Sequence, residues 1–461
     1  MGSKALRRAT DKMAAEGIDP TAIEVFAHYF RLLEHGETGM IPEKAIQPLD
    51  MESLADVTVD PQAAKDAIAT TAVIKLNGGL GTSMGMDRAK SLLCVRRGLS
   101  FLDIITRQVL HLREEYDARL PLIFMNSFRT SADTMAALAR YGDLPVDGLP
   151  LEFLQNKEPK LLAKDLAPVS WPKDPDLEWC PPGHGDIYTA LLATGLLDQL
   201  IEAGYTRVFV SNSDNLGAVP DARVAGWFAE SGAPFAIEAV RRTANDRKGG
   251  HFARRKEDGR IILRESAQTL PEDREALADL ERHRFTSTNN LWFDLAAMKE
   301  ALVARGGVLG LPLIRNLKHL DPSDPKTPEV IQIETAMGAA IEVFEKARTI
   351  EVGRDRFVPV KTTDDLLVLR SDVYDIGGDF VLGQTGDEVP FVGLDPSVYK
   401  LVGEFDKRFP EGAPSLREAT SLTVEGDWTF GPGVAIKGAV SLDRRPSAQR
   451  IPADAVLGAD D

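Results

Sequence analysis

Short apolar segments alternate with amphipathic segments between residues 71 and 240. Apolar runs of a length typical of strands lie at 71–77, 121–126, 151–154, 207–215 and 234–240. Segments with apolar residues at helical spacing lie at 101–116, 134–141, 186–204 and 222–231. This alternation predicts an α/β fold with a parallel, doubly wound sheet and helices on both faces.

The two ends of the chain follow other patterns. Residues 4–35 predict two amphipathic helices, and the Pro- and Asp-containing stretch 41–62 predicts a linker. Near the other end, Val424, Phe430 and Ile436 lie six residues apart, with glycines between them. A six-residue apolar period predicts a parallel β-helix, and a small β-meander remains the alternative.

Composition limits the class of protein. The chain has 461 residues, a length typical of two or three domains, and a formal net charge of −16. Such an acidic surface disfavours binding to nucleic acid or to an anionic membrane, whereas a phosphate pocket needs only a few local cations. With two cysteines and neither a signal peptide nor a long apolar run in the sequence, we expect a cytoplasmic protein.

Polar clusters follow three of the expected strands, at 76–91, 126–128 and 211–217. Ligands of open parallel sheets bind beyond the carboxyl ends of the strands. We therefore expect these clusters to form the functional site.

The cluster at 76–91, LNGGLGTSMGMDRAKS, is rich in glycine and ends in Lys90 and Ser91. Glycines let the backbone approach a ligand and expose its N–H groups, so a strand, a glycine turn and a cation predict a phosphate cradle. The dinucleotide fingerprint is excluded because residue 84 is Met, and the Walker pattern because Arg88 and Ala89 precede Lys90. A turn that merely connects strand to helix is the alternative.

Three more residues are candidates for chemistry. His184 lies on a Pro-Gly turn ahead of a predicted helix and is suited to donate to a phosphate or a sugar hydroxyl. Asp214 follows a strand, where a carboxylate can bind Mg²⁺ together with phosphate oxygens. Lys361, at an expected strand end, would add a second cation. The alternatives are a loop or core histidine, an Asx-turn and a surface lysine.

These clusters together resemble the eukaryotic-type UTP–glucose-1-phosphate uridylyltransferase family over roughly residues 70–460. The shared motifs, in family order, are LNGGLGTSMG, KSL, FLD, MNSF, PPGHGDIY, VSNSDNLGA, KGG, TNNLW, IQIETAMGAAI, RFVPVKTTDDLL and LTVEGDWTFG. The related UDP-N-acetylhexosamine enzymes resemble the sequence less, because they normally lack Asn77 and the His184-Gly185-Asp186 turn.

The resemblance implies a Rossmann-like nucleotidyltransferase fold of the glycosyltransferase-A type, with a mixed, mostly parallel sheet, followed by a left-handed parallel β-helix. We expect an N-terminal helical segment at 1–60, a catalytic domain at 61–375 and the β-helix at 376–461. The implied reaction is magnesium-dependent, in-line transfer of uridylyl from UTP to glucose 1-phosphate, without a protein nucleophile. Another sugar 1-phosphate (galactose or N-acetylhexosamine) and a catalytically silent UDP-sugar sensor are the alternatives. A monomer or small homo-oligomer is expected.

The resemblance also implies the roles of individual residues. UTP would contact Leu76, Asn77, Gly78, Gly79, Lys90, Gln155, Gly183 and Asn212, with Gln155 and the Gly183 backbone at uracil. Glucose 1-phosphate would contact His184, Gly250, Glu265, Asn289 and Asn290. Asp214 would hold Mg²⁺, and Lys90 and Lys361 would lie at the reacting phosphates.

Two departures from the family pattern bear on these expectations. The family usually has a GPKS-like approach to the lysine, and DRAKS stands here, so Arg88 and Ala89 are expected to alter the loop that carries Lys90. The C-terminal segment is also shorter than in eukaryotic members, so contacts that build larger oligomers are expected to be missing.

Overall fold

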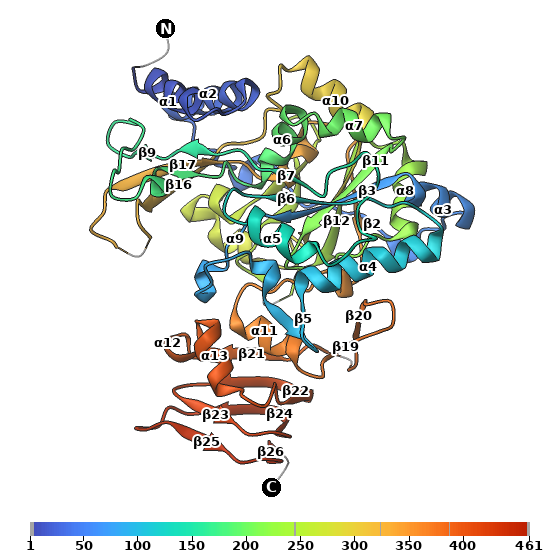
Figure 1. Cartoon of the computed structure of the whole chain (residues 1–461), viewed down its shortest axis with the longest axis vertical. Helices are drawn as coiled ribbons and strands as arrows, with labels where there is room; N and C mark the ends of the chain where they lie inside the picture. Colours follow the sequence, from blue (N-terminus) through green and yellow to red (C-terminus); the bar gives the residue numbers. More distant parts are fainter. Residues whose placement is uncertain (1–3, 244–245, 323, 387, 459–461) are drawn as a thin grey trace.

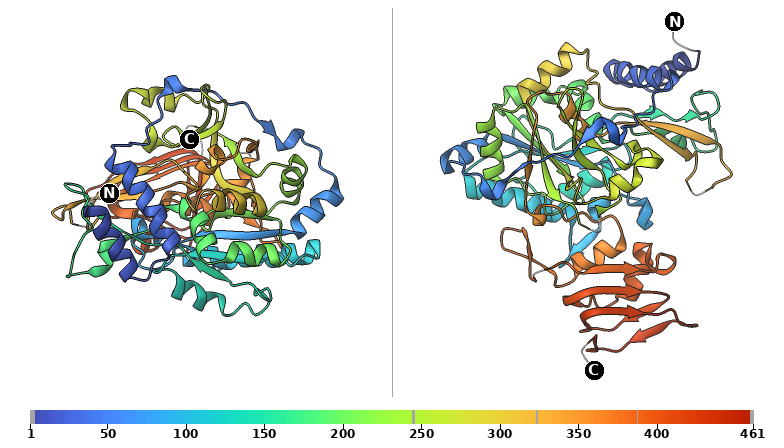
Figure 2. Two further views of the ribbon diagram at one scale, coloured as in Figure 1. Left: turned by 90° about the horizontal axis from the view of Figure 1, so that it is seen from above. Right: turned by 180° about the vertical axis from the view of Figure 1, so that it is seen from behind.

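The computed structural model describes residues 4–243, 246–322, 324–386 and 388–458. The molecule is elongated, with two N-terminal helices at one end and a stack of C-terminal strands at the other (Figure 1). The main sheet and its helices lie between these ends, and the view from behind shows the same order (Figure 2, right).

The main sheet is mixed and mostly parallel, as the family resemblance implies, whereas the alternating pattern alone predicts a purely parallel sheet. Its strands, in spatial order, are β2 (Glu52–Ser53), β18 (Arg348–Glu351), β12 (Phe235–Arg241), β15 (Phe285–Asp294), β11 (Arg207–Asn212), β3 (Thr71–Asn77), β6 (Leu122–Asn126) and β7 (Glu152–Leu154). Only β15 runs antiparallel to both of its neighbours. The carboxyl ends of β11, β3 and β6 therefore meet at one edge of the sheet.

Side chains that alternate along the central strands pack into two separate hydrophobic cores, one on each face of the sheet. On β3, Val73 belongs to one core, whereas Ala72 and Ile74 belong to the other. The first core includes residues of α3 (Pro61–Ala69), α4 (Phe101–Tyr116) and α8 (Ala222–Ser231). The second includes residues of α6 (Ile187–Ala193), α7 (Leu196–Glu202) and α10 (Leu295–Ala304). Helices thus cover both faces, as a strand buried on both sides requires.

The N-terminal helices cover a second, smaller sheet. Helices α1 (Lys4–Ala15) and α2 (Pro20–Glu34) share an apolar cluster with Leu161, Ile331 and Ile333. These residues lie on the antiparallel sheet of β16 (Ile314–His319), β17 (Glu329–Glu334) and β9 (Leu161–Leu162). The amphipathic pattern of residues 4–35 therefore has a specific partner surface.

After residue 390 the strands form two small parallel sheets. One contains β21 (Phe391–Leu394), β22 (Ser415–Val424), β24 (Ala435–Leu442) and β26 (Val456–Leu457), and the other contains β23 (Trp428–Phe430) and β25 (Gln449–Ile451). Val424, Phe430 and Ile436 are all buried, as their six-residue spacing predicts. Their strands pair in parallel, which differs from the antiparallel pairing of a meander.

The remaining elements are short. They are α5 (Ser131–Leu138), α9 (Arg274–Ala278), α11 (Thr363–Arg370), α12 (Pro396–Tyr399), α13 (Val402–Arg408) and the strands β1 (Ile46–Gln47), β4 (Cys94–Arg96), β5 (Leu99–Ser100), β8 (Glu158–Pro159), β10 (Trp179–Cys180), β13 (His251–Arg255), β14 (Ile261–Arg264), β19 (Tyr374–Ile376) and β20 (Leu382–Gln384). Within the described ranges, no helix has the length and hydropathy of a membrane span.

Both cysteines are free thiols, with Cys94 exposed and Cys180 buried.

Three sequence expectations need correction. The helix expected at 186–204 is two helices, because Gly195 adopts a left-handed backbone conformation (φ 71°) between them. The expected linker at 41–62 contributes β1 and β2 to two sheets, and α3 begins at Pro61. Lys361 does not end a strand; it precedes Thr362, the N-cap of α11, and Thr362 and Asp365 form a capping box.

Candidate active site

A cleft of about 290 Å³ lies at the carboxyl ends of β11, β3 and β6. Its lining residues come from the ends of β3, β6 and β11, the segment after β7, the glycine turn and its lysine, the Pro-Gly turn and the loop after β11. They are Leu76, Gly78, Gly79, Lys90, Met125, Gln155, Pro181, Gly183, His184, Asn212, Ser213 and Asp214. Nine of these were candidates from the sequence. Met125, Pro181 and Ser213 were not, although each lies inside a quoted motif.

Asn77 fixes the three strand ends that form the floor of this cleft. Its side-chain amide donates to Asn126 Oδ1 at 2.8 Å, and its Oδ1 accepts from the Ser213 hydroxyl at 3.0 Å. Asn77 is buried, so its side chain joins β3, β6 and the loop after β11 and does not line the cleft. Gly78 and Gly79 follow it directly and bring exposed backbone to the cleft.

Lys90 and Asp214 form an ion pair inside the cleft. Lys90 Nζ lies 2.7 Å from Asp214 Oδ2 and also donates to the carbonyl of Val360. The loop before Lys90 is closed by a bridge between Leu80 and Ala89. The DRAKS sequence therefore still delivers the lysine to the cleft.

The Pro-Gly turn is held in place by the segment after β17. Gly185 N donates to Thr335 O at 2.9 Å, and Thr335 N donates to Pro182 O at 3.0 Å. Gly183 has φ 79°, and a Cβ added there would lie 2.6 Å from Thr335 O, so only glycine fits. The turn is thus shaped by backbone contacts that larger side chains would break.

The segment after β17 fixes the tautomer of His184, and the Pro-Gly turn fixes the orientation of Gln155. Met337 N donates to His184 Nδ1 at 2.9 Å, so the neutral imidazole carries its proton on Nε2. The amide nitrogen of Gln155 donates to Gly183 O at 3.0 Å, while its oxygen faces Gly78. Both side chains line the cleft with defined donor and acceptor groups.

Lys361 and the remaining candidates lie outside the lining of the cleft. Lys361 follows Val360, whose backbone N donates to Asp214 O at 3.1 Å and whose carbonyl accepts from Lys90. Burial raises the pKa of Glu265, and the positive charge of Lys361 opposes this shift, so these side chains interact electrostatically. A Cβ added to Gly250 would lie 2.6 Å from Glu265 Oε2, which places Gly250 against the same carboxylate.

Asn289 and Asn290 lie on a bulge of β15. The register with β12 shifts opposite Glu238, and Asn289 adopts a left-handed conformation with φ 58°. Asn290 is fully buried and donates to Glu238 Oε2 at 3.0 Å. Its own oxygen has no hydrogen-bond partner among the described residues. Bulges of this kind often re-aim side chains beside functional sites.

The comparisons with known proteins agree with this geometry. The sequence model of the family described as UTP–glucose-1-phosphate uridylyltransferase matches residues 23–437. The chain belongs to this family. One member, from Pyrus pyrifolia, is 37% identical over 420 residues, which cover 90% of this chain and 86% of the relative.

Solved structures support the same assignment. A variant of UDP-glucose pyrophosphorylase from Leishmania major, solved in complex with UDP-glucose, is 42% identical with a TM-score of 0.93. The alignment covers 99% of this chain and 98% of that chain. A UDP-glucose phosphorylase from Trypanosoma brucei is 40% identical with a TM-score of 0.91, over 99% of this chain and 98% of that one.

Asp214 is the carboxylate of this cleft that could hold a divalent metal ion together with a bound ligand. The described ranges contain no cluster of three or more His, Cys, Asp or Glu side chains that could hold a metal alone. Asp214 lines the cleft, and its Oδ1 accepts no hydrogen bond from a described residue. Mg²⁺ is commonly held by one or two carboxylates, substrate phosphates and water, which matches a single carboxylate in this cleft.

A buried carboxyl group lies close to the Pro-Gly turn of this family member, on the strand that pairs with the residues just before the turn. Glu158 on β8 is 3% exposed, and its Oε1 has no hydrogen-bond partner among the described residues. Burial, together with the nearby carboxylates of Asp186 and Glu334, raises the pKa of Glu158 well above 4.5. The folded state therefore keeps a proton that the unfolded chain releases above about pH 4.5, and folding becomes less favourable as the pH rises.

We expect Glu158→Gln to raise the melting temperature, and to raise it more at pH 8 than at pH 5. Glutamine is neutral at both pH values, so the variant escapes a cost of about 1.4 kcal/mol per pH unit between the unfolded and folded pKa values of Glu158. Thermal unfolding at the two pH values measures the difference, with the exposed Glu24→Gln as control. An equal shift at both pH values would show that Glu158 does not retain its proton on folding.

Proposed function

We propose that this protein transfers a uridylyl group from UTP to glucose 1-phosphate, giving UDP-glucose and pyrophosphate. The observation that carries the proposal is the cleft that combines the Gly78–Gly79 backbone with the Lys90–Asp214 pair and the oriented amide of Gln155. Exposed backbone N–H groups and a lysine suit a triphosphate, and an oriented amide suits the edge of a base. Membership of the uridylyltransferase family supports the same substrates.

The reaction needs positioning and charge neutralisation more than a protein nucleophile. A phosphate oxygen of glucose 1-phosphate attacks the α-phosphorus of UTP, and the bond from that phosphorus to the pyrophosphate leaving group breaks. Lys90 and Lys361 would neutralise negative charge on the phosphates, and His184 Nε2–H would donate to the sugar phosphate. When bound at Asp214, Mg²⁺ would supply positive charge to the phosphate oxygens. Such effects dominate phosphoryl-transfer catalysis.

The sugar phosphate is assigned to the region around Lys361. Gly250, Glu265, Asn289 and Asn290 would contact it, and the Gly250 backbone packs closely against the Glu265 carboxylate. Burial raises the pKa of Glu265, and the positive charge of Lys361 opposes this rise. Lys361 directly follows Val360, which bonds to both Asp214 and Lys90. The sugar and UTP would therefore meet at Lys361.

The direct test is pyrophosphate release from UTP and glucose 1-phosphate, with and without Mg²⁺. We expect release that requires both substrates and stops when the metal is chelated. Galactose 1-phosphate and N-acetylglucosamine 1-phosphate in the same assay test the sugar, and each is expected to react more slowly. Tight UDP-glucose binding without pyrophosphate release would contradict the proposal and favour a sensor.

We expect Gln155→Ala to reduce the preference for UTP over TTP and CTP. The alanine removes the side-chain amide that donates to Gly183 O at 3.0 Å. The lost hydrogen bond to the base is worth about 0.5–1.5 kcal/mol, so kcat/KM for UTP relative to TTP or CTP should fall about 2- to 12-fold. Assays with the three nucleotides measure the ratio. The control is Gln449→Ala, whose amide makes a similar bond to a backbone carbonyl in the C-terminal region. A variant that rejects TTP and CTP as well as the parent does would exclude this role.

Finer features of the fold are also inferred. The strands after β22 alternate between two parallel sheets, which supports a left-handed parallel β-helix within residues 376–461. The strand order of the main sheet supports a nucleotidyltransferase fold of the glycosyltransferase-A type at 61–375, with residues 1–60 as a helical attachment. A cytoplasmic location and a monomer or small homo-oligomer complete the proposal.

A further inference from the structure

The segment between β18 and α11 carries Lys361 but has little regular structure. It contains one turn of 3₁₀ helix at Arg354–Arg356 and an isolated bridge between Pro359 and Asn215. Lys361 lies at its end, with its backbone N bonded to Asp365 Oδ2 at 2.7 Å. A segment without a ladder of backbone hydrogen bonds needs other contacts to fix its position.

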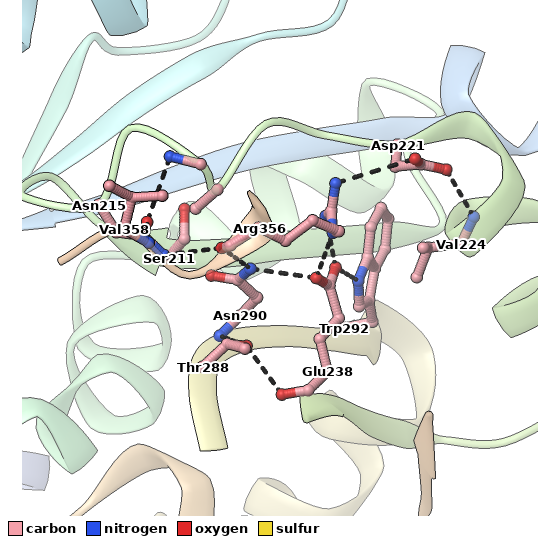
Figure 3. A network of polar contacts seen from close by, with 12 residues as sticks. Ser211, Asn215, Asp221, Val224, Glu238, Thr288, Asn290, Trp292, Arg356 and Val358 are labelled. Carbon is pink, nitrogen blue, oxygen red and sulfur yellow. Dashed lines mark hydrogen bonds and ion pairs between the residues drawn. The ribbon is translucent and has the colours of Figure 1, made fainter. Parts of the chain in front are cut away.

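A buried ion pair holds the middle of this segment (Figure 3). Arg356 Nε lies 2.6 Å from Glu238 Oε2, and its Nη2 lies 2.7 Å from Oε1, so the contact is bidentate. Arg356 is 7% exposed and Glu238 is fully buried. The two residues lie 118 positions apart in the sequence, and Glu238 belongs to the main sheet, so the ion pair fixes the segment to β12.

Glu238 also contacts the bulge of β15, which carries the sugar-site candidates. Asn290 Nδ2 donates to its Oε2 at 3.0 Å, and Trp292 Nε1 donates to its Oε1 at 2.9 Å. Its backbone oxygen accepts from the Thr288 hydroxyl at 2.7 Å. One carboxylate is therefore shared by the bulge and by the segment that leads to Lys361 (Figure 3).

Asn215 holds the same segment from the side of the nucleotide loop. Its amide nitrogen donates to Arg356 O at 3.1 Å, and its oxygen accepts from Val358 N at 2.9 Å. Asn215 directly follows Asp214, so the segment is tied to the loop that carries the metal-site candidate. The position of Lys361 relative to Asp214 is thus set by contacts on both sides of the segment.

A buried ion pair contributes little net stability, because removing two charges from water costs about as much as their attraction returns. Its geometry, however, is specific, since the planar guanidinium fits a carboxylate in one bidentate orientation. A charged pair at this place is therefore better explained by the position it enforces than by the stability it adds.

We propose that Glu238 and Arg356 are positioning residues that place Lys361 against the reacting phosphates in line with the sugar-binding bulge. The inference rests on the proposed uridylyl transfer and adds residues that need not touch either substrate. Arg356 acts through Lys361, so its effect on turnover depends on the presence of that lysine.

A double-mutant cycle tests this dependence. Arg356→Lys keeps the charge but loses the bidentate contact, and we expect it to lower kcat by about tenfold, with KM for UTP changed less than about threefold. In the Lys361→Ala background, Arg356→Lys is expected to cause no further loss of kcat. An equal loss in both backgrounds would overturn the proposal, because Arg356 would then act independently of Lys361.

A matched control and a second variant make the cycle decisive. Arg408→Lys alters a bidentate contact to Asp427 in the C-terminal region and is expected to leave kcat unchanged. If Arg356→Lys does not fold, Asn215→Ala enters the same cycle, because it removes both side-chain hydrogen bonds to the segment and leaves the ion pair intact.

Absence of pyrophosphate release by the unmodified protein would refute the proposed function, whereas an additive cycle in an active protein refutes only the positioning role.

Discussion

Asp214→Ala is expected to slow pyrophosphate release by about 100-fold or more at saturating substrates. The change removes the carboxylate assigned to Mg²⁺ and the partner that holds Lys90 Nζ at 2.7 Å. Two charge-assisted interactions of about 1.5–3 kcal/mol each are then lost from the transition state. Steady-state kinetics across a magnesium titration measure both the turnover and the metal requirement.

Two companion variants separate the roles of Asp214. Asp214→Asn keeps an acceptor for Lys90 but loses the negative charge, so it should need more Mg²⁺ for half-maximal rate. Asp427→Ala removes a carboxylate of similar exposure from an ion pair with Arg408 at 2.9 Å, far from the cleft, and should leave kcat unchanged. An Asp214→Ala variant with the turnover of the parent would refute the assigned metal site.

Lys361→Ala is expected to lower turnover by more than about tenfold while the protein remains folded. One charge-assisted hydrogen bond to a phosphate is worth about 1.5–3 kcal/mol, or about 10- to 150-fold if it forms only in the transition state. The lysine side chain is exposed, so its removal should cost little stability. The kcat and the melting temperature are measured together.

The control for Lys361 is Lys437→Ala, which removes a lysine paired with Glu418 at 2.9 Å on the C-terminal strands. We expect it to keep the kcat of the parent. If Lys361→Ala also turned over at the parental rate, Lys361 would have no part in the chemistry, and the positioning role of Arg356 would fall with it.

Local patterns predicted the centre of the molecule well, because each strand and helix there has a continuous period. The polar clusters after β3, β6 and β11 meet at one sheet edge, as parallel strands require. The glycine turn, Lys90, His184 and Asp214 line one cleft, as expected from the sequence. Their chemical roles remain predictions.

Features that depend on distant contacts were not predictable. The bulge that buries Asn290 arises from a register shift opposite Glu238, and register is not visible in either strand alone. The break at Gly195 lies within a helical period that continues on both sides. Arg356 begins the RFVPVKTTDDLL motif and Glu238 lies in the expected strand at 234–240, so no sequence spacing indicated their contact.

The packing of the first two helices has a consequence for shortened forms of the protein. Leu6, Phe26 and Phe30 share an apolar cluster with Ile331 and Ile333 on β17. Strand β17 leads directly to Thr335, which holds the Pro-Gly turn. Deleting residues 1–35 would expose this apolar surface to water next to the turn that is proposed to contact the base. Such a truncated protein should self-associate and bind nucleotide poorly, although it would retain every residue assigned to the reaction.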